Sequence, residues 1–410
     1  MKIAVIGAGI IGVTTAYELS RDGHEVTVLE RRGAAAEEAS FANAGIVAPD
    51  MPIRETGHYF NHPSPIRLRW PIAAHELAWY WKWQRARRGD RQRGNRDQLQ
   101  RLASYSHERL HQLTADLKLD YERSEGLLLL LRTEQDSKMI QASLQQLRAA
   151  GREFKELSAA GARKKEPALS PDTPLFGAIE LPGAEVANCR QFALLLKNEC
   201  LRRGVTFAFN TEVTHIHSAS ASGVTLTVAG DASAPPYDAL AICAGADSAR
   251  LLVPAGVKLR LAGVQGYSIS AQIREPLNAP RSGVVDQRHQ VAITRLGNRV
   301  RVSGLAELGG VAGHKRVDAL QTLYRALHDW FPGAAKLSSG VQEWQGARPM
   351  LSDGAPVIGA SGVPGLWLNL GHGNSGWAHS CGSARLLADL IAGQAPEMDI
   401  NGLGIERLGL

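Results

Sequence analysis

A glycine-rich turn near the start of the chain is the feature that most constrains its fold. The apolar run Lys2 to Ile6 has the character of a buried parallel strand, and a helical stretch from about Ile10 to Arg21 begins inside the turn. At this spacing the first glycine permits the tight turn, the second lets the backbone approach a pyrophosphate, and the third lets the helix pack on the strand. The helix N-terminus supplies an anion site. The residues predicted to contact a dinucleotide are Gly7, Ala8, Gly9, Ile10, Ile11 and Gly12.

A second short strand leads to an acidic residue that narrows the choice of dinucleotide. The strand is Glu25 to Leu29, and Glu30 follows it. A carboxylate about 20 residues after the turn accepts hydrogen bonds from a ribose hydroxyl and repels a 2′-phosphate, so FAD or NAD fits and NADP does not. Small and polar residues come next, instead of the further strand–helix units usual in NAD domains, which favours FAD. The residues of this segment expected to wrap the cofactor are Arg31, Ser40, Asn43, Ala44 and Gly45.

Composition places the chain among ordinary globular proteins. Its 410 residues are 44% hydrophobic and 21% charged, which excludes disorder, collagen and a disulfide-rich scaffold and suits two or three domains, or one large core with an inserted domain. A net charge of +6 does not by itself specify a partner. No apolar run reaches the ~18 residues of a membrane-spanning helix. The four cysteines form no CxxC pair, so we predict no metal site, no disulfide framework and a reducing compartment.

Later glycines follow the same logic, and a different type of sheet is predicted between them. The apolar run Ala239 to Cys243 predicts a buried strand that delivers a glycine to a flat cofactor. Alternation from His289 to Gly304 predicts two antiparallel strands joined at Leu296 to Asn298, in a domain separate from the parallel sheet. A glycine-rich loop then opens a helix from about Trp377 to Ala392, and its N–H groups suit an electron-rich ring edge. The residues expected at the cofactor here are Ala244, Gly245, Gly371, His372, Gly373, Asn374, Ser375 and Gly376.

These motifs together resemble the D-amino-acid oxidase superfamily of flavoproteins, and within it the bacterial D-amino acid dehydrogenases. The resemblance rests on the GxGxxG turn, the acid–Arg pair after it, and the S-x-A-N-A-G run that begins at Ser40. It is most specific in two C-terminal blocks, G-x-R-P-x-x-x-D-G-x-P-x-x-G from Gly346 and G-H-G-x-x-G-W from Gly371. Further matching blocks, such as Leu181 to Leu196, extend it over nearly the whole chain.

The resemblance implies an α/β and α+β fold, in which a Rossmann-like FAD-binding domain is interleaved with an antiparallel-sheet substrate domain. The FAD-binding domain is expected to comprise residues 1–118, 184–258 and 342–410, with a Trp/Arg-rich insertion at about 52–98, and the substrate domain residues 119–183 and 259–341. The resemblance also places the backbone of Val213 beside the adenine and Gly346 at the cofactor. FAD is expected to bind noncovalently, because a small buried cysteine such as Cys381 is usually a packing residue.

The chemistry that the resemblance implies is oxidative deamination of D-amino acids by hydride transfer from Cα to flavin N5, followed by hydrolysis of the imine to a 2-oxo acid and ammonia. Arg348 is expected to hold the substrate carboxylate, Tyr267 to hydrogen-bond the same group, and His372 to assist deprotonation of the amine, with His289 a weaker candidate. Electrons are expected to pass to a quinone or another acceptor. Three alternatives stay open: a dehydrogenase of cyclic imino acids such as D-hydroxyproline or D-proline, a glycine- or sarcosine-type oxidase using oxygen, and a flavin-binding redox sensor without catalysis.

The strongest local departure from average composition is a segment in which tryptophans precede arginines. Its residues are Trp70, Trp79, Trp81, Trp83, Arg85, Arg87, Arg88, Arg91, Arg93 and Arg96. The segment suits attachment to an anionic bilayer, and it suits equally a helical hairpin with its aromatics packed inside. Nucleic-acid binding has no other support in the chain, and Glu134 to Leu157 further on is expected to be helical. We therefore expect a cytoplasmic protein, with peripheral attachment to the inner face of a bacterial cytoplasmic membrane as an open alternative.

Overall fold

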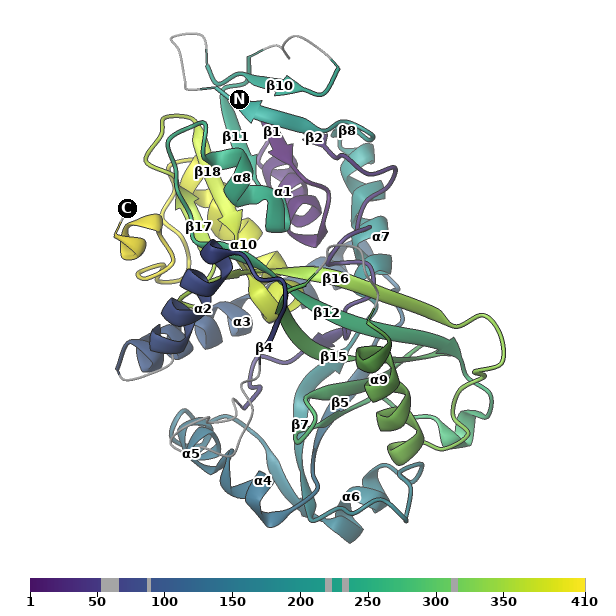
Figure 1. Cartoon of the computed structure of the whole chain (residues 1–410). Helices are drawn as coiled ribbons and strands as arrows, with labels where there is room; N and C mark the ends of the chain where they lie inside the picture. Colours follow the sequence, from purple (N-terminus) through teal and green to yellow (C-terminus); the bar gives the residue numbers. More distant parts are fainter. Residues whose placement is uncertain (53–65, 87–89, 218–222, 231–235, 311–315, 410) are drawn as a thin grey trace.

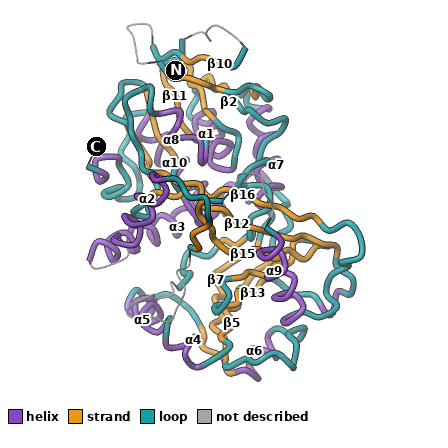
Figure 2. Tube along the Cα trace, in the orientation of Figure 1, coloured by secondary structure: helices purple, strands orange, loops and turns teal. Residues whose placement is uncertain are grey.

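The computed structural model describes residues 1–52, 66–86, 90–217, 223–230, 236–310 and 316–409 (Figure 1). These residues form two large β-sheets, one of six strands in the upper part of the view and one of ten strands in the lower part. Helices and loops cover both sheets, as Figure 2 shows in purple and teal around the orange strands. The fold is therefore the expected combination of a Rossmann-like α/β unit and a second, largely antiparallel sheet.

The six-stranded sheet carries the glycine turn. Its order is β17-β18-β11-β1-β2-β8, and its strands are parallel except for β17, which is antiparallel to β18. The register pairs Ile6 with Leu29, so the turn after β1 and Glu30 after β2 meet at one edge of the sheet. The strands are β1 (Lys2–Ile6), β2 (Glu25–Leu29), β8 (Thr206–Ala208), β11 (Ala239–Ile242), β17 (Val357–Ala360) and β18 (Leu366–Leu370).

Alternate residues of β1 pack into different layers, as expected of a strand covered on both faces. Ile3 and Val5 belong to the core beneath four helices, while Ala4 and Ile6 pack on the other face against two short strands and one helix. The four helices are α1 (Ile10–Arg21), α3 (Asp90–Leu117), α7 (Cys189–Arg202) and α10 (Gly376–Ile391). The elements of the other face are β9 (Val213–Ile216), β10 (Leu226–Val228) and α8 (Ser248–Leu252).

The ten-stranded sheet runs in the order β16-β12-β15-β14-β13-β5-β7-β3, with β4 beside β15 and β6 beside β7. Most pairs are antiparallel, and the predicted hairpin is confirmed, because β14 and β15 pair around Gly297 and Asn298. One face packs on α9 (Val317–Trp330). The strands are β3 (Ile46–Val47), β4 (Arg67–Arg69), β5 (Ser124–Leu131), β6 (Lys155–Ser158), β7 (Gly177–Val186), β12 (Leu261–Gln272), β13 (Gly283–Asp286), β14 (Val291–Leu296), β15 (Arg299–Gly309) and β16 (Gln342–Leu351).

Two expectations are changed by the observed elements. The single helix expected over Glu134 to Leu157 is two short helices, Glu134–Lys138 and Gln141–Ala149. The helical stretch ends there because Gly151 adopts a left-handed φ of +68° and β6 then pairs with β7. The strand β16 belongs to the ten-stranded sheet, although it begins at the residue where the third FAD-binding segment was expected to start. The remaining helices are α2 (Ala74–Ala86), α4 (Glu134–Lys138), α5 (Gln141–Ala149), α6 (Ala159–Lys165) and the 3-10 turns η1 (Gly245–Asp247), η2 (Pro276–Asn278), η3 (Gly373–Ser375) and η4 (Ile405–Leu408).

The Trp/Arg-rich segment is partly internal. Trp79 and Trp83 lie four residues apart on α2 and are buried, whereas Trp70 and Trp81 are 84% and 67% exposed. Arg87 and Arg88 lie outside the described residues, as do the side chains of Arg91 and Arg93. Within the part of the chain that the structure describes, every helix is too short or too polar to cross a bilayer.

A buried carboxylate at the end of β13 joins the end of β5, the turn before β14, and α9. Asp286 at the end of β13 is fully buried and accepts hydrogen bonds from Arg132 Nε at 2.8 Å, Trp330 Nε1 at 2.8 Å and His289 Nδ1 at 3.1 Å. Burial alone would raise the pKa of Asp286, but the hydrogen bonds and the charge of Arg132 outweigh it and hold the pKa well below its ordinary value. This carboxylate therefore stabilises the fold in its ionised form.

We expect Asp286→Asn to lower the free energy of unfolding by about 3–5 kcal/mol, because it removes the fully buried charge to which the Arg132 guanidinium and the Trp330 N–H bond. Denaturant unfolding at neutral pH measures the loss. The control is Asp329→Asn, which removes the other, 41% exposed partner of Arg132 and should cost at most about 1 kcal/mol. A depressed folded-state pKa means that the stabilisation is present above about pH 4 and fades as the pH falls, so a difference between wild type and Asp286→Asn that is unchanged at about pH 3 contradicts the assignment.

Candidate functional site

The glycine turn brings the ends of two strands and the start of α1 together. Gly7 has a φ of +102°, and a Cβ on Gly12 would lie 1.8 Å from the Gly7 carbonyl oxygen. A Cβ on Gly7 would lie 2.7 Å from the carbonyl oxygen of Cys243, which follows β11. No side chain fits at either position, so the helix N-terminus reaches the sheet edge with its backbone uncovered.

Glu30 and Ser40 hold this turn in place while keeping hydrogen-bonding capacity. Glu30 is 9% exposed; its Oε2 accepts from the N–H of Ala8 at 2.7 Å and its Oε1 from the N–H of Arg32 at 2.8 Å. A carboxylate has about four acceptor sites, so each oxygen can still accept a ribose hydroxyl. The Ser40 hydroxyl accepts from the N–H of Ile10 at 3.0 Å, which leaves its hydrogen to donate.

The segment expected beside the adenine lies against the same acid. The N–H of Thr211 donates to the Glu30 carbonyl at 2.8 Å, and Val213 opens β9 two residues later. Arg31, by contrast, forms surface ion pairs with Glu38 at 3.0 Å and Asp247 at 2.8 Å. The structure therefore brings Thr211, two residues before Val213, against Glu30, and it directs the charge of Arg31 to neighbouring carboxylates.

The small-residue segment connects the two sheets. Gly45 has a φ of +72°, and its N–H donates to Asn43 Oδ1 at 3.0 Å. From the ten-stranded sheet, Thr294 Oγ1 donates to the Ala44 carbonyl and Arg301 Nη1 to the Asn43 carbonyl, both at 3.1 Å. These bonds fix which face of that sheet is turned toward the small-residue segment.

That face carries hydroxyl groups that form no hydrogen bond with the described residues. Along β12, Gly266, Ser268 and Ser270 point to the same side, and Arg301 Nε donates to Ser270 Oγ at 2.9 Å. The hydroxyls of Ser268 and of Ser303, its direct cross-strand neighbour, are buried and form no hydrogen bond with any described residue. Sequence reasoning missed these serines, although the alternation of β12 and β15 is the signal that groups them.

Arg348 lies across the same face. A Cβ on Gly266 would meet its guanidinium carbon at 2.4 Å, so only glycine leaves room for the side chain. Its Nη1 donates to the carbonyl of Leu305 at 2.7 Å, and no ion pair with a described carboxylate offsets its charge. Burial lowers the pKa of Arg348 to about 10, although the side chain remains partly exposed. A partly accessible guanidinium without an acidic partner is suited to bind an anionic ligand.

Tyr267 lies on the opposite face of β12 and is not brought together with Arg348. Its hydroxyl donates to Glu307 Oε2 at 2.8 Å, and Arg69 forms an ion pair with the same carboxylate. Burial and the Glu307 charge raise the pKa of Tyr267 well above its ordinary value. His289, the weaker candidate, is held by a hydrogen bond with Asp286. Neither Tyr267 nor His289 therefore faces the small-residue segment.

The glycine-rich loop before α10 contains a buried, neutral histidine. Gly371 and Gly373 have φ values of +81° and +56°, and the loop passes through η3 into α10, whose N-cap Ser375 makes no side-chain capping bond. His372 Nε2 lies 2.8 Å from Asn369 Oδ1, which only accepts, so Nε2 carries the proton. Nδ1 is then an acceptor, buried and without a partner among the described residues. Burial holds the pKa of His372 well below its ordinary value, and His379 adds to this. His372 therefore offers an acceptor.

The space above Gly346 is filled by an aromatic side chain. A Cβ there would lie 1.7 Å from the indole of Trp344, which stacks on Phe41 at a centroid distance of 6.0 Å. Arg190 in turn lies 4.3 Å from the Phe41 ring centroid. Gly346 thus makes room for Trp344, and this aromatic pair closes the face that carries Arg348.

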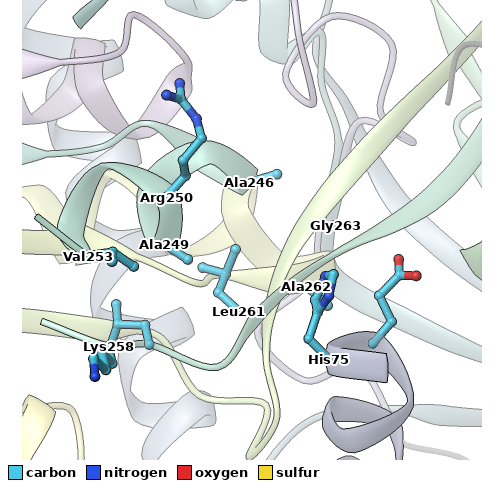
Figure 3. A pocket seen from close by; sticks show the side chains of 11 residues that line it. His75, Ala246, Ala249, Arg250, Val253, Lys258, Leu261, Ala262 and Gly263 are labelled. Atoms are coloured by element: carbon cyan, nitrogen blue, oxygen red, sulfur yellow. The ribbon is translucent and has the colours of Figure 1, made fainter. Parts of the chain in front are cut away.

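Two cavities flank this arrangement. One of about 380 Å³ opens beside Ala246, with Lys258 and His75 on its two sides (Figure 3). The other, of about 440 Å³, lies on the Tyr267 side of β12. Arg348 lines neither of these two cavities.

Comparison with known proteins agrees with this geometry. A model of the FAD dependent oxidoreductase family matches residues 2–390. A D-amino acid dehydrogenase of Cereibacter sphaeroides is 38% identical, with 99% of this chain and 95% of the relative covered. One of Rhizobium rhizogenes is 36% identical over the full length of both chains. Among solved structures, glycine oxidase from Geobacillus kaustophilus has a TM-score of 0.79 at 23% identity, with 98% of each chain covered.

We expect Gly12→Ala to abolish flavin retention, because its methyl group would push α1 away from Gly7 and displace the anion site. The ratio of flavin to protein absorbance in the purified variant measures this. Gly183→Ala is the control, since a Cβ there meets nothing within 4 Å. A Gly12→Ala protein with a full flavin complement would show that the turn does not depend on this contact.

Proposed function

The chain belongs to the family of FAD-dependent oxidoreductases, and we propose that it is a dehydrogenase that oxidises D-amino acids to 2-oxo acids and ammonia. The observation that carries this proposal is Arg348, a guanidinium on the cofactor-facing side of β12 with no acidic partner among the described residues. Full-length similarity to relatives that carry the name D-amino acid dehydrogenase supports the substrate class.

The residues around the turn fit FAD. The uncovered N-terminus of α1 suits the pyrophosphate, Glu30 the ribose, and the backbone near Val213 the adenine. The hydroxyls of Ser268 and Ser303, which bond to no described residue, and the start of α10, which has no side-chain cap, are polar groups able to bond to the cofactor. When bound, FAD supplies a two-electron acceptor for the hydride of the substrate Cα–H bond.

FAD is proposed to be held without a covalent bond. Cys381 is 2% exposed within α10, and burial raises the pKa of its thiol to about 12. A thiol in this state is not the nucleophile that covalent attachment requires. The same argument applies to Cys243, which lies next to the turn and whose thiol pKa burial also raises to about 12.

Arg348 is proposed to hold the substrate carboxylate. One of its five N–H donors is used by the Leu305 carbonyl, which fixes the plane of the guanidinium and leaves donors for a bidentate bond to the two carboxylate oxygens. This bond positions Cα beside the face that the glycines leave open. Orientation of the reacting bond is the main contribution that the protein makes.

The amine is proposed to react in its neutral form, without a side-chain base. His372 is a poor proton acceptor, because burial and His379 disfavour its charged form. Arg301 and Arg348 lie on the same face, and their charges disfavour a further positive charge beside them. This lowers the pKa of a bound substrate ammonium. His372 Nδ1 is then left to accept a hydrogen bond from a ligand N–H.

Electrons are proposed to pass to a membrane quinone, with the protein peripheral on the inner face of a bacterial cytoplasmic membrane. Trp70 and Trp81 are highly exposed, and exposed tryptophan is favoured at the lipid headgroup level. Arg85 lies in the last turn of α2, where it can approach lipid phosphates. The cavity beside Ala246 reaches His75 at the start of the same helix, which supports approach of the acceptor from this side.

We expect D-amino acids to bleach the flavin under anaerobic conditions, and Arg348→Ala to raise KM about 100-fold with FAD retained, because two charge-assisted hydrogen bonds are lost. Stopped-flow absorbance with a panel of D- and L-amino acids, hydroxyprolines and N-methylglycine measures both effects. Reoxidation by a soluble quinone is expected to be faster than reoxidation by oxygen.

The control for this variant is Arg260→Ala, which removes an exposed arginine before β12 and should leave KM unchanged. No bleaching by any amine would refute the proposed reaction. Bleaching by cyclic imino acids or N-methylglycine alone would move the substrate class to one of the alternatives. Loss of FAD from Arg348→Ala would assign Arg348 to cofactor binding instead.

The double substitution Trp70→Ser with Trp81→Ser is expected to lower partitioning onto anionic vesicles about tenfold or more, because each exposed indole contributes interfacial burial. Cosedimentation with phosphatidylglycerol vesicles, with dye-coupled activity as a check of folding, measures the effect. The matched control is Leu277→Ser, because Leu277 is an 84% exposed apolar residue. Trp367→Ser is not a suitable control, because Trp367 lies in a strand of the six-stranded sheet and packs on the core. Equal partitioning of all variants would rule out this attachment.

A further inference from the structure

Two histidines and a buried glutamate meet away from the cofactor face. His107 and His111 lie one turn apart on α3, with ring centroids 4.3 Å apart. Glu185, near the end of β7, is 4% exposed, and its Oε1 lies 3.6 Å from His107 Nε2 and 2.5 Å from His111 Nε2. One potential ligand atom from each side chain lies within 4.8 Å of the others.

The hydrogen bonds of this cluster are incomplete. His107 Nε2 and Glu185 Oε2 are both buried, and within the part of the chain that the structure describes neither has a hydrogen-bond partner. A buried carboxylate oxygen without a donor is costly, and so is an imidazole nitrogen that points into the same space. The arrangement is therefore poorly explained by hydrogen bonding alone.

A metal ion would satisfy all three groups. A tetrahedral Zn²⁺ with ligand distances of about 2.0–2.2 Å places neighbouring ligand atoms roughly 3.3–3.5 Å apart. The His107–Glu185 separation of 3.6 Å is already close to this value. His111 needs to withdraw by about 1 Å, which its 44% exposed side chain is able to do, and its open side leaves room for a water ligand.

We propose that His107, His111 and Glu185 form a binding site for a Zn²⁺-type divalent cation. Two imidazoles and one carboxylate are ligands that zinc and its transition-metal neighbours prefer, whereas Mg²⁺ and Ca²⁺ prefer oxygen atoms alone. The sequence contains the two histidines at a spacing of four, a recognised metal-ligand pattern on a helix. The third ligand is 74 residues further along the chain, which is why sequence patterns did not reveal the site.

Occupancy of the site ties α3 to the cofactor-binding segment. Val47 of β3 pairs with Glu185, and the N–H of Ala187 donates to the Gly45 carbonyl at 2.7 Å. A metal held by Glu185 and by α3 therefore restrains the stretch that includes Gly45. Because the ion binds the folded chain, it raises the melting temperature of the protein.

Arg123 is a competitor whose removal gives a distinctive test. Its Nη1 lies 3.7 Å from Glu185 Oε1, and its side chain is 36% exposed. A guanidinium beside the carboxylate repels a cation and occupies the same oxygen, so Arg123→Ala is expected to tighten Zn²⁺ binding severalfold. A cluster that serves only as a hydrogen-bonded contact between α3 and β7 would be weakened by the same change and would gain no affinity for metal.

The test is calorimetric titration of the chelator-treated, FAD-loaded protein with zinc chloride. We expect one Zn²⁺ per chain, no heat with magnesium chloride, and a higher melting temperature with zinc. His107→Gln with His111→Gln is expected to lower the affinity at least about 100-fold. The matched control is His328→Gln, which alters an exposed histidine on α9 and should leave binding unchanged.

Anomalous diffraction at the zinc edge locates the ion. Density between the three side chains supports the proposal, and density elsewhere overturns it. Binding that survives in the double histidine variant, or the absence of stoichiometric binding to the wild-type protein, also overturns it. Because Glu185 is buried and its replacement risks misfolding, the single variant His111→Gln, at an exposed position, keeps the test decisive.

Discussion

The close contact between α1 and β1 is the constraint on which the rest of the structure depends. A Cβ on Gly12 would lie 1.8 Å from the Gly7 carbonyl oxygen, so only glycine there lets the first turn of α1 pack against the end of β1. Glu18 on the same helix is fully buried and forms ion pairs with Arg385 of α10 at 2.8 Å and with Arg109 of α3 at 2.9 Å. A buried carboxylate between two guanidiniums fixes the relative positions of three helices, since displacement of any one leaves a charge unpaired. The anion site and the glycine loop before α10 are thereby held in register.

The ten-stranded sheet completes the site because its two faces have different chemistry. One face packs Ile269, Val300 and Val302 against α9, and the apolar contacts keep it dry. The other face has guanidinium and hydroxyl groups that bond to the small-residue segment or lack protein partners. Buried hydroxyls without a partner among the described residues are costly, and a ligand that bonds to them would offset that cost.

Features that depend on neighbours in sequence could be predicted, and features that depend on strand register could not. The bounds of α1 and the β14–β15 hairpin follow from glycine positions and local periodicity. By contrast, β6 becomes a strand only because β7 offers an edge, and Tyr267 and Arg348 lie on different strands whose relative register no local pattern contains. Since a shift of one residue moves every side chain to the other face, Tyr267 could not be assigned to a face from sequence. Helical spacing alone would have separated buried Trp79 and Trp83 from exposed Trp81.

The stretch of α3 from Ser106 to His111 contacts α1, α10 and β7. Ser106 lies against Gly382 of α10, where a Cβ would come within 2.9 Å of the Ser106 backbone. Arg109 pairs with α1, and the two histidines on either side of it face β7. These contacts alternate around the helix, so a rotation of α3 that improves one of them breaks another. The helix α3 therefore couples the positions of α1, α10 and β7 to one another.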